Sequence, residues 1–180
     1  MRGRSPAARP PFYVFFLLAL LLLLSACELY GKVGGDNTNI QGSLPDLLRG
    51  EWAYLPPGSD VASELYAISG NTLSYGYGGE SSPTDYTGLI RFVSNYSSDS
   101  GLIIIEYSKP PSYALYNGLP FFAVYYRNLR SDTVQLANAV HPDYSAPDTA
   151  TLEEALGKFT RMNMGYYVNW GVVQPQRRVR

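Results

Sequence analysis

Few residues in this chain belong to the types that carry chemistry, and they lie far apart in the sequence. Its 180 residues include one cysteine, Cys27, and one histidine, His141. A cysteine thiol is a nucleophile that acyl groups modify, whereas a histidine becomes a useful base when a nucleophile and an orienting acid stand beside it. No serine lies in a Gly-x-Ser-x-Gly context, and neither a phosphate loop nor a dinucleotide fingerprint occurs. We therefore expect a protein that is not an enzyme and that holds no cofactor.

The acidic residues near His141 do not complete a catalytic or metal site. Asp143 and Asp148 follow it on a loop that also contains prolines. A metal site requires several converging ligands, and one histidine with two aspartates would bind a cation only weakly. Glu153 and Glu154 face different sides of an expected helix, where acidic residues stabilise the first turn. We expect no metal site and a solvent-exposed His141, and a hydrolase that uses His141 as its base stays open as an alternative.

The lone cysteine follows a segment built like an export signal. The first ten residues carry Arg2, Arg4 and Arg9 and no acid, and residues 12–24 form an unbroken apolar run. This run has about the length of a signal-peptide core and is shorter than the roughly 20 residues that cross a bilayer. Two small residues then precede Cys27. The alternative is an uncleaved N-terminal membrane helix with an incidental cysteine.

The tetrapeptide Leu24-Ser25-Ala26-Cys27 resembles the bacterial lipobox, Leu-(Ala/Ser)-(Gly/Ala)-Cys, at all four positions. This resemblance implies that 1–26 is a signal peptide, that the peptide bond before Cys27 is cut, and that the thiol is acylated with fatty acids such as palmitate. Two or three acyl chains hold a protein firmly on a membrane, because each buried methylene contributes roughly 0.8 kcal/mol. The expected location is the cell envelope, on its periplasmic or surface-exposed face.

The mature chain is slightly acidic and long enough for one domain. Removing 26 of the 180 residues, with three of the 14 basic residues and no acid, leaves 154 residues with 11 basic and 15 acidic side chains. This balance argues against a nucleic-acid partner. Residues 27–43, rich in glycine and asparagine, are expected to form a flexible tether, in which Glu28 favours the outer over the inner membrane. The basic tail 174–180 is expected to be a solvated end.

Hydrophobic patterning indicates a mainly β fold. Sixteen tyrosines and frequent turn residues are typical of pleated, half-buried surfaces. Residues 44–48 predict a helical turn, and Thr151-x-x-Glu154 predicts a capped helix at 152–159. Because no βαβ rhythm occurs, we expect an antiparallel meander over 44–173 that closes into a barrel or a strongly curved sheet, with one short late helix. The predicted strands include 64–69, 72–77, 86–94, 102–107, 121–127, 133–140 and 164–173.

Gly50 and Trp52 resemble the Gly-x-Trp that opens the first strand of lipocalins and their calycin relatives after a short helical turn. The resemblance implies a lipocalin-like barrel whose floor is closed by Trp52. In that family a late arginine stacks on the tryptophan, and the resemblance assigns this role to Arg161, just after the expected helix.

An aromatic-rich stretch is the best candidate for a binding surface. Tyrosine offers a large contact area and a polar tip. These residues stand beside a long proline-containing loop at 109–120 that could rim a barrel mouth, although members on strands could instead fill the core. The candidate ligand-binding residues are Tyr107, Tyr113, Tyr116, Phe122 and Tyr126.

These observations together predict a lipid-anchored envelope protein that acts as a non-enzymatic binding module. The predicted partners are the membrane, through acylated Cys27, and either a small apolar ligand or an envelope or host protein. An envelope hydrolase that uses His141 and a scaffold of an outer-membrane assembly remain alternatives.

Overall fold

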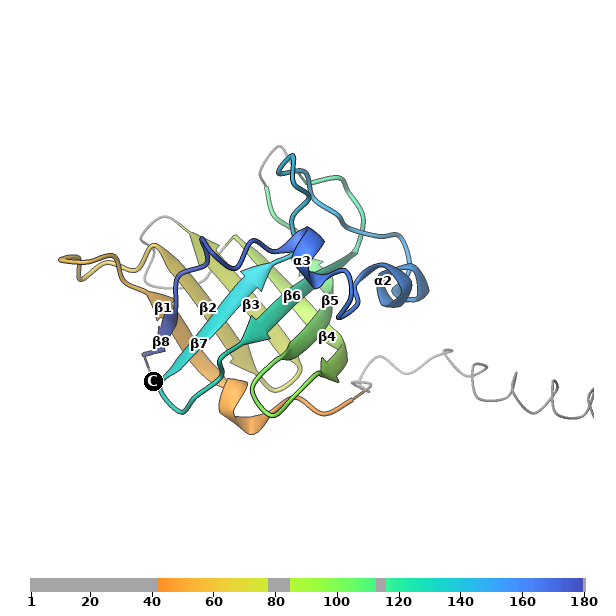
Figure 1. Cartoon of the computed structure of the whole chain (residues 1–180). Helices are drawn as coiled ribbons and strands as arrows, with labels where there is room; N and C mark the ends of the chain where they lie inside the picture. Colours follow the sequence, from red (N-terminus) through yellow and green to blue (C-terminus); the bar gives the residue numbers. More distant parts are fainter. Residues whose placement is uncertain (1–41, 78–84, 113–115, 180) are drawn as a thin grey trace, which may run out of the picture. The chain divides into compact units, whose positions relative to one another are not determined.

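Eight antiparallel strands close into a barrel in the computed structural model, which describes residues 42–77, 85–112 and 116–179 (Figure 1). Cys27, the predicted signal peptide 1–26 and most of the predicted tether 27–43 lie outside the described residues. The strands are β1 Gly50–Tyr54, β2 Glu64–Ser69, β3 Thr72–Tyr77, β4 Tyr86–Asn95, β5 Gly101–Lys109, β6 Phe121–Arg127, β7 Thr133–Asn138 and β8 Gln176–Arg178. The helices are η1 Asp46–Leu48, α2 Leu152–Lys158 and α3 Met164–Tyr167. None of these helices has both the length and the apolar character needed to span a membrane.

The topology is the expected meander. Each strand from β1 to β7 pairs antiparallel with the next, and β8 pairs with both β7 and β1. The predicted mainly β fold and closed antiparallel barrel are confirmed. The bounds predicted for 64–69, 72–77 and 121–127 are those of β2, β3 and β6. The bounds of these three strands therefore followed from the sequence, both for the alternating β2 and for the aromatic-rich β6.

The prediction for the C-terminal region was wrong in two places. Residues 164–173 do not form the final strand: they begin with α3, in which Tyr167 is buried and Tyr166 is exposed. The closing strand is β8, which lies within the predicted solvated tail 174–180. Its sequence is polar, yet Gln176 is fully buried and its side-chain oxygen accepts from the Leu136 backbone N–H (2.7 Å). Because β8 is held by buried polar contacts, its sequence does not alternate between apolar and polar residues, and such a pattern is typical of a loop.

The last two residues of the predicted tether 27–43 contact the barrel. Asn95 of β4 donates its side-chain N–H to the carbonyl of Ser43 (2.9 Å), and a side chain on Gly42 would collide with the backbone of Val93. Residues 42 and 43 therefore already lie against the barrel.

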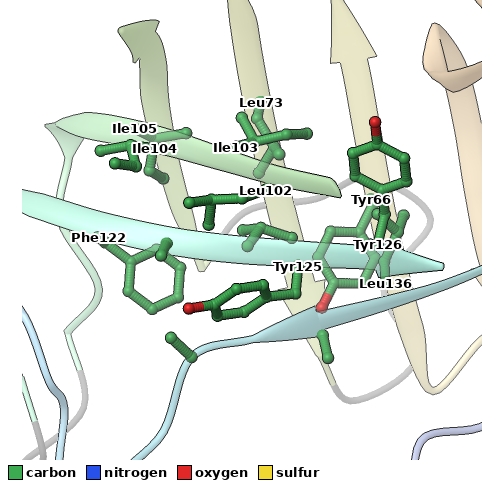
Figure 2. Close-up of a cluster of buried hydrophobic side chains, with 14 of the residues drawn as sticks. Tyr66, Leu73, Leu102, Ile103, Ile104, Ile105, Phe122, Tyr125, Tyr126 and Leu136 are labelled. Carbon is green, nitrogen blue, oxygen red and sulfur yellow. The ribbon is translucent and has the colours of Figure 1, made fainter. Parts of the chain in front are cut away.

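A second layer covers part of the outer wall. Helix α2 begins at the capping box expected from Thr151 and Glu154, with the Glu154 N–H donating to the Thr151 hydroxyl (3.1 Å). The helix packs on β6, and Ala155 and Phe159 are buried with the outward residues of β5 and β6. As expected from its apolar sequence, β5 is therefore covered on both faces. Figure 2 shows four neighbours from this strand, Leu102, Ile103, Ile104 and Ile105.

Trp52 closes one end of the barrel. The indole is fully buried and donates its N–H to the Leu48 carbonyl of η1 (2.8 Å). Leu48 and Leu44 are buried with it, as expected for a helical turn that plugs the core. Gly50 has a φ of 127°, which L residues rarely adopt, so the glycine two positions before the tryptophan is required where η1 turns into β1.

The arginine that stacks on Trp52 is Arg178, not Arg161. The Arg178 guanidinium lies 4.4 Å from the centroid of the indole, whereas the Arg161 guanidinium lies 6.0 Å from the ring of Tyr96. Arg178 also donates to the carbonyls of Ser131 (2.9 Å), Arg49 (2.8 Å) and Leu47. The Arg178 side chain thus joins β8 to Leu47 of η1, to Arg49 between η1 and β1, and to Ser131 in the turn between β6 and β7. Arg178 was not considered for this role because its segment, which forms strand β8, was predicted to be a solvated tail.

We expect Arg178→Ala to lower the free energy of unfolding by about 2–4 kcal/mol, because three carbonyls lose a charged donor and the indole loses its stacked partner. Urea denaturation measures this change. Arg177→Ala is the matched control, since Arg177 is the exposed neighbour on the same strand, and its effect should stay within about 0.5 kcal/mol. Equal effects of the two substitutions would show that the Arg178 contacts do not stabilise the barrel.

Candidate ligand-binding site

The inner face of the barrel is largely aromatic. The strand register places Trp52, Tyr66, Tyr75 and Tyr86 side by side across β1 to β4. Ring centroids are 4.8 Å apart for Tyr66 and Tyr75 and 5.2 Å apart for Tyr75 and Tyr86, and Phe122 meets Tyr86 edge-on at 5.6 Å. These distances are those of favourable aromatic pairs. The rings of Tyr66, Tyr75, Tyr86 and Phe122 therefore form a continuous packed layer.

A bond network across the interior holds this layer in place. The side-chain oxygen of Asn138 on β7 accepts from the hydroxyls of Tyr66 (3.1 Å) and Tyr86 (2.8 Å), which come from β2 and β4. Buried polar groups with such partners fix the orientation of the side chains that carry them. The aromatic layer thus has one defined arrangement.

Below this layer, toward Trp52, the barrel is filled. Tyr126 is fully buried and donates its hydroxyl to the side-chain oxygen of Asn95 (2.5 Å). Its ring occupies the space beside Gly101, where an added Cβ would lie 2.6 Å from the tyrosine oxygen. Figure 2 shows Tyr126 among Tyr66 and Leu136 in this core. Tyr126, predicted as a ligand contact, is therefore a core residue, because the glycine opposite it provides the space for its ring.

Above the layer, at the end opposite Trp52, the barrel holds a cavity of about 640 Å3. The inward strand residues Tyr75, Tyr107 and Phe122 line it, and the loops after β5 and β7 rise over this end (Figure 1). The remaining lining residues are Tyr77, Pro111, Tyr116, Asn138, Ala139, Val140, Tyr144, Ala146 and Asp148. Of the predicted contacts, the structure brings together Tyr107, Tyr116 and Phe122, while Tyr113 lies outside the described residues.

The aromatic wall of this cavity is closely packed. Tyr107 stacks on Phe122 with centroids 5.6 Å apart and an interplanar angle of 18°. Tyr116, from the loop after β5, meets Tyr107 edge-on at 5.4 Å. The wall therefore combines two strands with the loop that connects them.

Asp148 is the one acidic residue among those that line the cavity. It is only 3% exposed, and in the described part of the chain neither of its carboxylate oxygens has a hydrogen-bond partner. The next residue, Thr149, forms a two-way backbone bridge with Phe121 at the start of β6 (2.9 and 3.1 Å), which fixes this position against the barrel. The carboxyl group is thus buried by a well-anchored backbone.

Burial raises the pKa of Asp148 to about 7, and the positive charge of Lys158 on α2 opposes part of this rise. Burial, together with the charge of Asp148, raises the pKa of the Tyr116 hydroxyl. The charge of Asp148 therefore acts on Tyr116, which lines the same cavity. From sequence, Asp148 stands out only as a neighbour of His141, because an aspartate after a proline is typical of an exposed turn.

Glu64 is another acidic residue that faces the barrel interior, and its carboxyl group, unlike that of Asp148, has a hydrogen-bond partner in the described structure. Burial raises its pKa, and the hydrogen bond from the Gln176 amide to its carboxylate (3.0 Å) lowers it again. Gln176 belongs to β8 and also bonds to the backbone of Leu136. Glu64 is therefore part of the closing network, whereas Asp148 has no comparable role in the described structure.

His141 lies beside a second hollow of about 620 Å3, between the end of β7 and the segment 165–173. Its ring meets Tyr167 (5.5 Å) and Tyr166 (5.8 Å) edge-on. Across the described ranges, no hydrogen bond joins its imidazole to a serine or a carboxylate, and no cluster of three or more potential metal ligands occurs. The nearby Ser145 hydroxyl donates to Asp143 instead (2.6 Å). His141, predicted to be solvent-exposed, is therefore half-buried against tyrosines.

We expect Asp148→Asn to remove a pH dependence of stability. With its pKa raised above that of the unfolded chain, Asp148 binds a proton more readily when folded, so the free energy of unfolding should fall as pH rises from about 4 to about 7. Relative to the asparagine variant, the wild-type protein should lose about 2 kcal/mol between about pH 5 and pH 7. Urea denaturation across this range measures the difference. Asp60→Asn, at an exposed loop position, is the control, and parallel curves for wild type and Asp148→Asn would contradict the expectation.

Comparison with protein-family models, with curated proteins and with solved structures gave no significant match to this chain.

Proposed function

We propose that this protein is a lipid-anchored protein of the cell envelope that binds a small, mostly apolar ligand in the mouth of its barrel. The observation that carries this proposal is the cavity of about 640 Å3 with an aromatic lining. Sites for small molecules are typically concave, mainly apolar and in the range of about 300–1,000 Å3. A barrel built only for stability would have its mouth filled by side chains, as its opposite end is.

The rigidity of the cavity floor supports ligand binding. Tyr66 and Tyr86 are held by Asn138, and their rings form the base on which Tyr75, Tyr107 and Phe122 rest. A preformed site loses little conformational entropy when a ligand enters. The binding energy of an apolar ligand is therefore not spent on ordering these side chains.

The anchor is supported by the sequence around Cys27. The arginines at the N-terminus, the apolar run 12–24 and the lipobox-like Leu24-Ser25-Ala26-Cys27 together favour cleavage before the cysteine and acylation of its thiol. Glu28 favours the outer membrane. The lipid would tether the barrel in the envelope, where apolar compounds are plentiful.

A neutral fluorescent dye, N-phenyl-1-naphthylamine, tests the cavity. We expect the acylated protein in phosphatidylcholine nanodiscs to bind the dye above the signal of empty nanodiscs. Ala146→Trp, which fills the cavity from its loop, should weaken binding at least about tenfold, equivalent to about 1.4 kcal/mol. Ala150→Trp, on the same loop at an exposed position outside the lining, should leave binding unchanged. Equal effects of the two tryptophans would place the dye elsewhere.

Metabolic labelling with radioactive palmitate tests the anchor. The wild-type protein should incorporate the label and fractionate with membranes, and its mass should correspond to a chain that begins at an acylated Cys27. Cys27→Ser should abolish both label and cleavage, because the hydroxyl does not replace the thiol as acyl acceptor. An unlabelled wild-type protein that retains residues 1–26 would instead indicate an uncleaved membrane helix.

A further inference from the structure

An apolar ligand alone leaves one feature of the cavity unexplained, which is Asp148. A purely apolar compound would bury this carboxyl further without giving it a partner, and burial of an unpaired polar group is unfavourable. On the basis of the proposed function, we infer that the ligand carries a protonated amine, which the carboxylate of Asp148 binds and the neighbouring aromatic rings enclose.

The geometry of Asp148 fits a cationic donor. In the described structure Asp148 is among the residues that line the cavity, and its two carboxylate oxygens are buried and accept no hydrogen bond. An ionised carboxylate only accepts hydrogen bonds, and an ammonium group only donates them, so the two satisfy each other without a further group. Such charge-assisted bonds are about twice as strong as neutral ones. A ligand amine would therefore supply what the fold does not.

The rings beside Asp148 favour the same charge. Tyr116 lines the same cavity as Asp148, and its ring contacts Tyr107. Tyr107 in turn stacks on Phe122, so that three rings line the cavity together with the acid. Aromatic faces attract cations through their quadrupole, most strongly where water is excluded. The carboxylate and the faces of the rings together give the site a negative electrostatic potential.

The described charges outside the cavity do not complete this site. Lys158 acts on Asp148 through space, but its ammonium lies over the ring of Phe159 (5.9 Å) and forms no ion pair with the carboxylate. The ion pairs within the described residues involve other acids: Asp46, Glu106 and Asp99. A metal ion is not favoured, because a single carboxylate offers too few ligands and no described cluster of three exists here. None of the described ion pairs includes Asp148, so a cationic ligand can act as its counter-ion.

Three indoles of matched shape test the inference: tryptamine, which is cationic, tryptophol, which is neutral, and indole-3-acetate, which is anionic. Each competes with the neutral dye on the acylated protein in phosphatidylcholine nanodiscs at about pH 8. We expect tryptamine to bind at least about tenfold more tightly than tryptophol, and indole-3-acetate to bind most weakly. Asp148→Asn should reduce tryptamine to the affinity of tryptophol and leave tryptophol unchanged. Asp60→Asn, which removes the same charge from an exposed loop, should preserve the preference.

The pH profile of the wild-type protein gives a second readout that does not depend on a variant. Tryptamine affinity should fall as the pH drops below about 7, because protonation of Asp148 removes the negative charge, whereas tryptophol affinity should stay level. A flat tryptamine profile would overturn the inference even if Asp148→Asn failed to fold.

The outcomes separate the inference from the proposed function. If the dye binds but tryptamine gains nothing over tryptophol, or fails to displace the dye, the ligand is apolar without an amine and the inference alone falls. If indole-3-acetate binds best and depends on Asp148, the carboxyl acts as a protonated donor and the inference is again wrong. If neither the dye nor any indole binds, the proposed function itself fails.

Discussion

The barrel depends on the closure made by a strand of only three residues. β8 forms two residue pairs with β1 and two with β7, which is little backbone pairing for a seam that runs the length of a barrel. Its side chains supply the rest, since Gln176 bonds to β7 and β2 while Arg178 covers Trp52 and binds three carbonyls around it. Hydrogen bonds from charged or buried groups are stronger than exposed ones, so a short polar strand can close the sheet.

Closure at this seam gives the interior two unequal halves. The half near Trp52 is closely packed, because Tyr126 occupies the space beside Gly101 and the turn η1 covers the end. The other half holds the cavity, and residues of the loops after β5 and β7, among them Tyr116 and Asp148, line it together with the aromatic side chains of the strands. The same strands therefore provide a rigid base at one end and a lined cavity at the other.

The sequence predicts those parts of the structure that follow from local chemistry. Strands with one buried face, the capping box at Thr151 and the turn before Gly50 all carry signals within a few neighbouring residues. The parts that depend on distant contacts are not predictable in this way. The bulge between Ile90 and Phe92 in β4 turns Phe92 away from the inner face and turns Val93 toward it. Strand β8 forms because the Gln176 side chain hydrogen-bonds to the distant Leu136. Likewise the burial of Asp148 arises from its bridge to β6 and from no feature of its own segment.

The late position of the closing strand has a consequence for the assembly of the barrel. Strands β1 to β7 leave the ribosome before β8, so that β1 and β7 retain open edges until residues 176–178 arrive. Open edges are templates for association between chains, and pairing over so long a sequence separation is slow. A nascent chain therefore has two unpaired strand edges until residues 176–178 are made, and a stop codon ahead of Gln176 would leave an unsealed seven-stranded sheet that is prone to associate with other chains.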